Sequence, residues 1–286
     1  MTAHDARLHA FRSDLADARL KGEVAADRFV AGRPARISVP MADIRKAPKT
    51  DSGVNTQALL GDDVLVFEDR EGWAWIQAER DGYVGYVAEA MLGTRDHAPT
   101  HIISVPRTFL YPGPDLRFPI AGQLSMGSTV TVTSAAETRG THYAVLPSGE
   151  AIIAGHLRPV GEMAGDYVSV AETFLGTPYL WGGVSGFGID CSGLVQLAMR
   201  MAGRQVLRDS DMQAASIGEQ LEPGPDFSGL QRGDLVFWKG HVAIMTDAET
   251  MIHANGHTML VSREGLKEAV ARIGYLYGGP TGFRRP

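Results

Sequence analysis

The chain's one cysteine stands at a position where a thiol can act as a nucleophile. Cys191 opens a predicted helix, where unpaired backbone N–H groups and the positive end of the helix dipole lower a thiol pKa. The preceding run WGGVSGFG holds four glycines, so we expect backbone that approaches a ligand closely and a sulfur that the core does not seal. This run matches no phosphate-binding loop. Although a lone cysteine is most often an inert buried residue, these surroundings predict nucleophilic chemistry.

Two histidines downstream of Cys191 can supply the base that such a thiol needs. His241 opens the strand-like run HVAIM, and His253 lies in the next run, MIHANG. An antiparallel turn between the runs would bring the two imidazoles side by side. A cysteine followed far downstream by a histidine and a polar orienting residue is the chain order of papain-like proteases. The alternative for either histidine alone is a structural role.

Length and composition limit the other classes of function. The 286 residues suffice for two or three compact units, and 27 basic against 33 acidic residues argue against nucleic acid or an anionic membrane as partner. One cysteine can form neither an internal disulfide nor a cysteine-based zinc site. No run approaches about 18 apolar residues, and the opening MTAHDARLHAFRSDLADARL does not resemble a signal peptide. We therefore expect a cytoplasmic protein.

The distribution of apolar, β-forming and turn residues along the chain predicts four segments. Residues 1–33 carry apolar positions at Leu8, Phe11, Leu15 and Leu20 and predict a helical N-terminal arm. Residues 34–95 and 96–160 are short β-rich runs separated by turn residues, typical of small barrels. Their strand runs open at Gly61 and Gly127, 66 residues apart, which indicates two copies of one unit.

Residues 161–286 predict an α+β domain, with helices first and an antiparallel sheet after them. The apolar stripe of the first helix starts at Tyr167 and ends before Gly176. The second helix runs from Cys191 to Gly203. Ser210 and Gln213 form a candidate capping box for a short third helix, and three strand-like runs follow.

The motifs of this last segment resemble the NlpC-type family of bacterial cysteine peptidases. They are GTPYLWGG, GIDCSGLVQ, LRDSDMQ, RGDLVFW, GHVAIM and MIHANG, while GWAWIQ and DGYVGYV resemble bacterial SH3 domains. The family subgroup with two SH3-like domains is the most similar. The resemblance implies a papain-like catalytic domain, with helices packed on an antiparallel sheet, over 161–286. Two small SH3-like barrels precede it, over 34–95 and 96–160, and no metal or cofactor is expected.

The resemblance assigns roles residue by residue. Cys191 corresponds to the nucleophile, His241 to the general base and His253 to the residue that orients the base. Tyr179 corresponds to the family tyrosine whose hydroxyl helps the backbone N–H of the cysteine to hold the oxyanion.

The resemblance also implies a small peptide as the substrate. Members of the subgroup cut the bond from γ-D-Glu to diaminopimelate or L-Lys in peptidoglycan stem peptides with a free N-terminal L-Ala, which here would mean recycling of wall peptides. Asp190, Ser192 and Ser210 match the positions around that amine, with helix capping as the alternative. Trp181 and Tyr83 are candidate groove walls, with barrel core as the alternative for an aromatic.

One departure from the family pattern and two rival functions remain. Gly53 stands where the subgroup often has an acidic residue, and Asp51 could substitute for it, so the strictness of free-amine selection is open. An acyltransferase or amidase could use the same thioester chemistry, but Asp190 beside the nucleophile favours a cationic amine in the groove. A non-catalytic SH3-type binding protein is the other rival. The sequence does not determine the preference between diaminopimelate and lysine, the oligomeric state or the role of residues 1–30.

Overall fold

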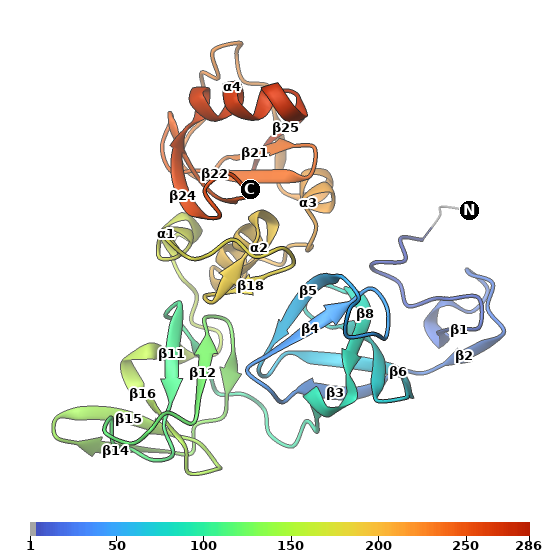
Figure 1. Ribbon diagram of the computed structural model, residues 1–286, viewed down its shortest axis with the longest axis vertical. Helices are drawn as coiled ribbons and strands as arrows, with labels where there is room; N and C mark the ends of the chain where they lie inside the picture. The colour runs from blue at the N-terminus through green and yellow to red at the C-terminus, as the bar shows by residue number, and fades with distance from the viewer. Residues whose placement is uncertain (1–3) are drawn as a thin grey trace. The chain divides into compact units, whose positions relative to one another are not determined.

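The computed structural model describes residues 4–286, which form two compact units that meet in sequence between Glu162 and Met163 (Figure 1). The first unit is almost entirely β-structure, and the second combines helices with a sheet. Within the described residues, no helix has the length and apolarity needed to cross a bilayer.

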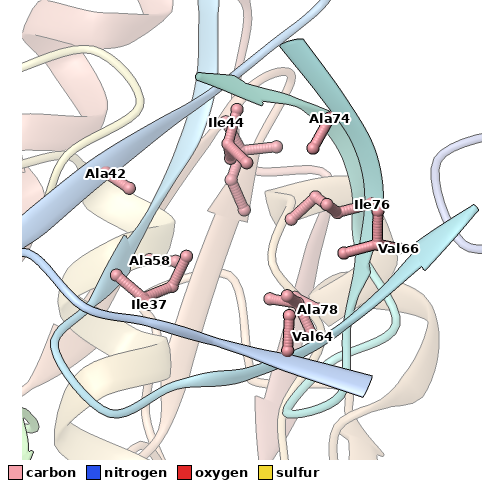
Figure 2. Close-up of a cluster of buried hydrophobic side chains, with 11 residues drawn as sticks. Ile37, Ala42, Ile44, Ala58, Val64, Val66, Ala74, Ile76 and Ala78 are labelled. Atoms are coloured by element: carbon pink, nitrogen blue, oxygen red, sulfur yellow. The ribbon is translucent and has the colours of Figure 1, made fainter. Parts of the chain in front are cut away.

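The first β-rich segment is a seven-stranded antiparallel sheet wrapped around one core. Its order is β5-β4-β8-β7-β6-β3-β9. Alternate side chains of successive strands, such as Val64, Val66, Ile76 and Ala78, point into this core, as a strand period of two requires (Figure 2). The elements are β3 (Arg33–Ile37), β4 (Met41–Arg45), β5 (Val54–Leu59), β6 (Asp63–Arg70), β7 (Trp73–Ala78), β8 (Val84–Ala88), the 3-10 turn η2 (Glu89–Met91) and β9 (Leu92–Gly93).

The second β-rich segment consists of three small antiparallel sheets, ordered β13-β10-β17, β11-β12 and β14-β15-β16. It has a core of its own around Ile103, Leu124 and Ile152. The elements are β10 (His101–Ile103), β11 (Arg107–Leu110), β12 (Gly122–Ser125), β13 (Thr129–Val130), β14 (Ser134–Thr138), β15 (Thr141–Val145), β16 (Ala151–Ile153), the 3-10 turn η3 (Ala154–His156) and β17 (Leu157–Pro159).

The two β-rich segments repeat one backbone arrangement at the predicted offset. The N–H of Gly61 donates to the carbonyl of Ile37 at 2.9 Å, and the N–H of Gly127, 66 residues later, donates to Ile103 at 3.0 Å. Both glycines have a positive φ, of 87° and 90°, which disfavours a side chain. The same glycine turn therefore recurs in both segments. That the second copy is an SH3-like barrel stays a prediction.

The prediction of a helical N-terminal arm is wrong for residues 4–33. This stretch forms β1 (Leu15–Asp17), the 3-10 turn η1 (Ala18–Leu20) and β2 (Arg28–Val30), which pairs parallel to β1. Ala10 and Leu15 pack with Trp75 of the adjacent sheet. Aspartates in this stretch bond to nearby backbone and arginine groups, as Asp17 does with the N–H of Arg19. Such local bonds compete with helix formation, so the apolar spacing alone did not decide the structure.

The second unit is built on a six-stranded sheet with helices on both faces. The sheet order is β20-β25-β21-β22-β23-β24. In Figure 1, α1 and α2 lie on one side of this sheet and α4 on the other. The helices are α1 (Tyr167–Glu172), α2 (Cys191–Met201), α3 (Ser210–Ser216) and α4 (Leu266–Tyr277); the strands are β18 (Val184–Ser185), β19 (Gly188–Ile189), β20 (Glu219–Leu221), β21 (Leu235–Trp238), β22 (His241–Met245), β23 (Thr250–Asn255), β24 (Leu260–Gly265) and β25 (Gly282–Arg285).

The sequence predicted the start of α2 and the strand order around the histidines, but it missed two later elements. Helix α4 packs on the sheet through Leu266, Ala269 and Ile273. Strand β25, the last in sequence, lies between β20 and β21 in the sheet. The capping box is also wrong. Asp209 rather than Ser210 is the N-cap of α3, and the Gln213 amide donates to the backbone carbonyls of Ser192 and Leu207 instead.

Candidate active site

Cys191 is the first residue of α2, as predicted, and Asp190 caps that helix. The Asp190 carboxylate accepts the backbone N–H of Gly193 at 2.7 Å. The backbone N–H of Val242, next to His241 on β22, acts on Cys191 as a hydrogen-bond donor. The start of α2 is therefore held against the strand that carries the first histidine.

The expectations of an uncovered sulfur and a lowered thiol pKa are wrong for the resting structure. Cys191 is only 7% exposed. Burial, followed by the negative charge of Asp190, raises the pKa of the thiol to about 12, despite the helix terminus. Burial also lowers the pKa of His241 to about 3, with the neighbouring His253 as the next cause. Both shifts favour the neutral forms, the thiol of Cys191 and the unprotonated imidazole of His241.

The glycines before Cys191 allow the backbone to approach itself closely. Residues 184–189 form the small hairpin of β18 and β19. A Cβ on Gly183 would lie 2.5 Å from the carbonyl oxygen of Gly188, and a Cβ on Gly193 would lie 2.3 Å from that of Gly183. Only glycine fits such contacts. Sequence reasoning had assigned these glycines to a ligand and had overlooked Gly193.

The two histidines lie side by side, as the sequence predicted. Strands β22 and β23 pair antiparallel, with Ile244 opposite Ile252. His241 Nε2 lies 2.9 Å from His253 Nδ1, and the ring centroids are 5.1 Å apart. His253 is 1% exposed, and burial lowers its pKa to about 4. This contact can fix the ring orientation of His241, since one imidazole donates and the other accepts.

Tyr179 is held close to the start of α2. Its backbone N–H donates to Met259 at 2.8 Å, and it forms an isolated bridge with Ile189, two residues before Cys191. Burial, followed by the electrostatic interaction with Cys191 and Asp190, raises the pKa of the Tyr179 hydroxyl to about 12. The hydroxyl is therefore protonated at neutral pH and can donate a hydrogen bond.

Asp190 forms a buried ion pair that sequence reasoning missed. Arg208, 1% exposed, donates to both carboxylate oxygens of Asp190, at 3.0 and 2.6 Å, and to Ser192 Oγ at 2.7 Å. The backbone N–H of Gly182 also donates to Asp190, at 2.9 Å. A guanidinium thus neutralises the carboxylate that the sequence had assigned to a substrate amine. The only sequence signal was an arginine directly after the apolar pair Val206 and Leu207.

The remaining predicted binding residues lie in different surroundings. Ser210 is the first residue of α3, and Gln213 of the same helix donates to Ser192, so α3 starts close to the amine candidates. Trp181 is 72% exposed, as a groove wall requires. Tyr83 is buried and belongs to the first unit. Its place at the substrate stays a prediction.

Gly53 and Asp51 lie in the exposed turn between β4 and β5, also in the first unit. Within residues 4–286, no cluster of three or more histidine, cysteine, aspartate or glutamate side chains could hold a metal ion.

Two segments of the chain match known protein families. Residues 176–272 match the NlpC/P60 family, and residues 44–92 match the bacterial dipeptidyl-peptidase Sh3 domain. The first match contains Cys191 and both histidines. The C-terminal unit is therefore a cysteine peptidase domain. More particularly, residues 176–272 are similar to NlpC/P60 domains, in a chain that also has a segment similar to an SH3 domain.

Relatives with curated names cover most of the chain. A γ-D-glutamyl-L-lysine dipeptidyl-peptidase of Bacillus subtilis is 28% identical over 72% of this chain and 73% of its own length. The Bacillus cereus protein of the same name is 27% identical over 70% of this chain and 67% of its own length. A solved NlpC/P60 family protein from Bacillus cereus covers 88% of this chain and 99% of its own, with 24% identity and a TM-score of 0.73. This structural likeness shows a shared papain-like fold.

Proposed function

We propose that this chain hydrolyses the bond from γ-D-Glu to diaminopimelate or L-Lys in peptidoglycan stem peptides that begin with a free L-Ala. The observation that carries the proposal is the placement of Cys191 at the start of α2, against the strand of His241, with His253 at 2.9 Å behind that imidazole. The names of the Bacillus relatives support the substrate. They do not separate diaminopimelate from lysine for this chain.

The proposed reaction begins with a neutral pair. His241 takes the thiol proton as Cys191 Sγ attacks the γ-carbonyl carbon, because the raised thiol pKa keeps the proton on sulfur until substrate binds. The carbonyl π bond breaks as the S–C bond forms, and the oxyanion accepts hydrogen bonds from the backbone N–H of Cys191 and the Tyr179 hydroxyl. The carbonyl then re-forms as the C–N bond breaks and His241 protonates the departing amine, which leaves a thioester.

Hydrolysis of the thioester completes the cycle. His241 removes a proton from water, the hydroxide oxygen bonds to the acyl carbon, and the S–C bond breaks. The thiolate of Cys191 regains the proton from His241. His253 keeps the His241 ring oriented through both halves of the reaction.

We propose that hydrogen-bonding groups select the free amine more than net charge does. Ser192 and Ser210 offer hydroxyl acceptors, while Arg208 already compensates the charge of Asp190. The structure thus supports a polar subsite of little net charge. Trp181 remains a proposed groove wall, whereas the burial of Tyr83 favours its alternative role in the barrel core. The SH3 domain would exclude stem peptides that are cross-linked or that still carry sugars. The enzyme would then act in peptide recycling in the cytoplasm.

Mass spectrometry of L-Ala-γ-D-Glu-diaminopimelate tests the proposal. We expect wild type to release L-Ala-D-Glu from this peptide but not from its N-acetylated form, and Cys191→Ala to release nothing. Cleavage of both peptides would retain the peptidase and remove amine selection. Cleavage of neither, or of intact sacculi as fast as of the free tripeptide, would overturn the proposed substrate.

A further inference from the structure

A carboxylate stands behind the second histidine, outside the set of residues assigned so far. Glu264 lies on β24, where it pairs with Met251 of β23, two residues from His253. Glu264 Oε2 lies 3.2 Å from His253 Nε2. The buried Nε2 atom has no aligned hydrogen-bond partner within residues 4–286. Glu264 is therefore the acceptor towards which this nitrogen can turn.

Helix α4 fixes the carboxylate from the opposite side. Arg272 donates to Glu264 Oε1 at 2.8 Å through Nε and to Oε2 at 2.5 Å through Nη2. This two-point contact sets the plane of the carboxylate and holds the pKa of Glu264 below its usual range. Glu264 is thus an anion throughout the neutral range. The charged and titratable groups that face it are Arg272 on α4, His253 on β23 and His257 in the following turn.

We propose, on the basis of the proposed peptidase function, that Glu264, held by Arg272, is a positioning residue that makes His241 the base. A carboxylate accepts only, so it selects the His253 tautomer with hydrogen on Nε2 and leaves Nδ1 as an acceptor. His253 Nδ1 then accepts from His241 Nε2–H, which leaves the lone pair of His241 on Nδ1. One partly buried anion thus sets the tautomers of two imidazoles, first His253 and then His241.

The same chain of contacts stabilises the charge that the reaction creates. When His241 takes the thiol proton it becomes an imidazolium, and its Nε2–H bond to His253 strengthens. The His253 Nε2–H then donates more strongly to Glu264, and this contact shortens as the ring turns. No proton needs to reach Glu264. The carboxylate acts through His253, so its loss lowers kcat rather than substrate affinity.

The test replaces the carboxylate with a group that can also donate. Glu264→Gln is compared with wild type by nitrogen-15 NMR of the imidazoles and by cleavage of L-Ala-γ-D-Glu-diaminopimelate. We expect His253 to lose its uniform Nε2–H tautomer and kcat to fall about 10- to 100-fold, with KM little changed. The matched control is Arg263→Gln on the same strand, which breaks the exposed contact to Glu172 and should alter neither readout.

A second variant keeps the carboxylate and removes Arg272, which also lowers the pKa of His241 and His253. Arg272→Met removes the groups that lower the Glu264 pKa, so the carboxyl protonates at a higher pH. We expect the tautomer of His253 to be lost at a higher pH than in wild type, and the acid limb of kcat to move the same way. If Glu264→Gln does not fold, Arg272→Met still tests the role of Glu264.

The outcomes separate this proposal from the peptidase assignment. An unchanged His253 tautomer in Glu264→Gln, or a changed tautomer with unchanged kcat, overturns the role of Glu264. If the wild-type protein does not cleave the peptide, the proposed function fails, while the tautomer measurement still decides whether Glu264 orients the histidines.

Discussion

Two arginine–carboxylate pairs flank the candidate site, and they differ in burial. Arg208 and Asp190 lie under the nucleophile, with side chains 1% and 10% exposed. Arg272 and Glu264 lie behind the imidazoles, with side chains 29% and 21% exposed. A fully buried charge is costly when its partner is lost, whereas a partly hydrated one is not. The comparison teaches that the first pair maintains the fold of the site and the second adjusts its chemistry.

The largest expected effect comes from breaking the buried pair. Arg208→Met leaves the Asp190 carboxylate without its cation and should lower the free energy of unfolding by about 3–5 kcal/mol. Arg272→Met, the matched change in the other pair, should cost at most about 1 kcal/mol. Urea unfolding measures both, and amide exchange in α2 assigns the transition to the C-terminal unit. Equal losses would contradict the comparison.

The second prediction concerns the proposed oxyanion donor on the nucleophile side. Tyr179→Phe removes a hydroxyl that is proposed to donate only as charge develops on the substrate, so kcat should fall about 10²- to 10³-fold with KM nearly unchanged. Steady-state kinetics on the tripeptide measures this. Tyr167→Phe is the control, because that hydroxyl donates to the carbonyl of Gly233 and serves packing alone. A fall in kcat of the same size in the control would remove the specific role of Tyr179.

The third prediction concerns how the stability contributed by the two imidazoles changes at low pH. The folded-state pKa values of His241 and His253, about 3 and about 4, lie below the unfolded value of about 6.5. Their neutral forms therefore stabilise the fold above about pH 6.5, and this contribution is lost as the pH falls towards 4 and 3. The slope is at most about 1.4 kcal/mol per pH unit for each imidazole. His253→Gln should reduce the slope in unfolding experiments between pH 7 and 4.5; an identical slope would show that His253 does not contribute.

The smallest expected effect is on the reactivity of the thiol. Because the pKa of Cys191 is raised to about 12, alkylation by iodoacetamide should rise about tenfold per pH unit from 7 to 9. A thiol pKa lowered by the helix terminus, as the sequence predicted, would instead give fast reaction near pH 6. A rate plateau near that pH in the free enzyme would mean that the ion pair forms before substrate binds.

Local patterns determined much of this protein. Apolar spacing and the final glycine placed α2 and its first residue, Cys191. The short turn between two strand-like runs brought His241 beside His253, because adjacent antiparallel strands pair in a register that a short connection restricts. The glycines 66 residues apart marked a turn that the structure contains twice.

Only the tertiary structure decided which side chains compensate one another. Arg208 is 18 positions from Asp190, and no common helix or strand contains the two, since α2 ends at Met201. Arg272 reaches Glu264 because α4 packs across the sheet. Burial then outweighed the helix terminus at Cys191, since desolvation depends on everything that surrounds the sulfur and not on its place in the chain. Sequence order could therefore identify the reacting groups, while their charge states depended on packing between distant segments.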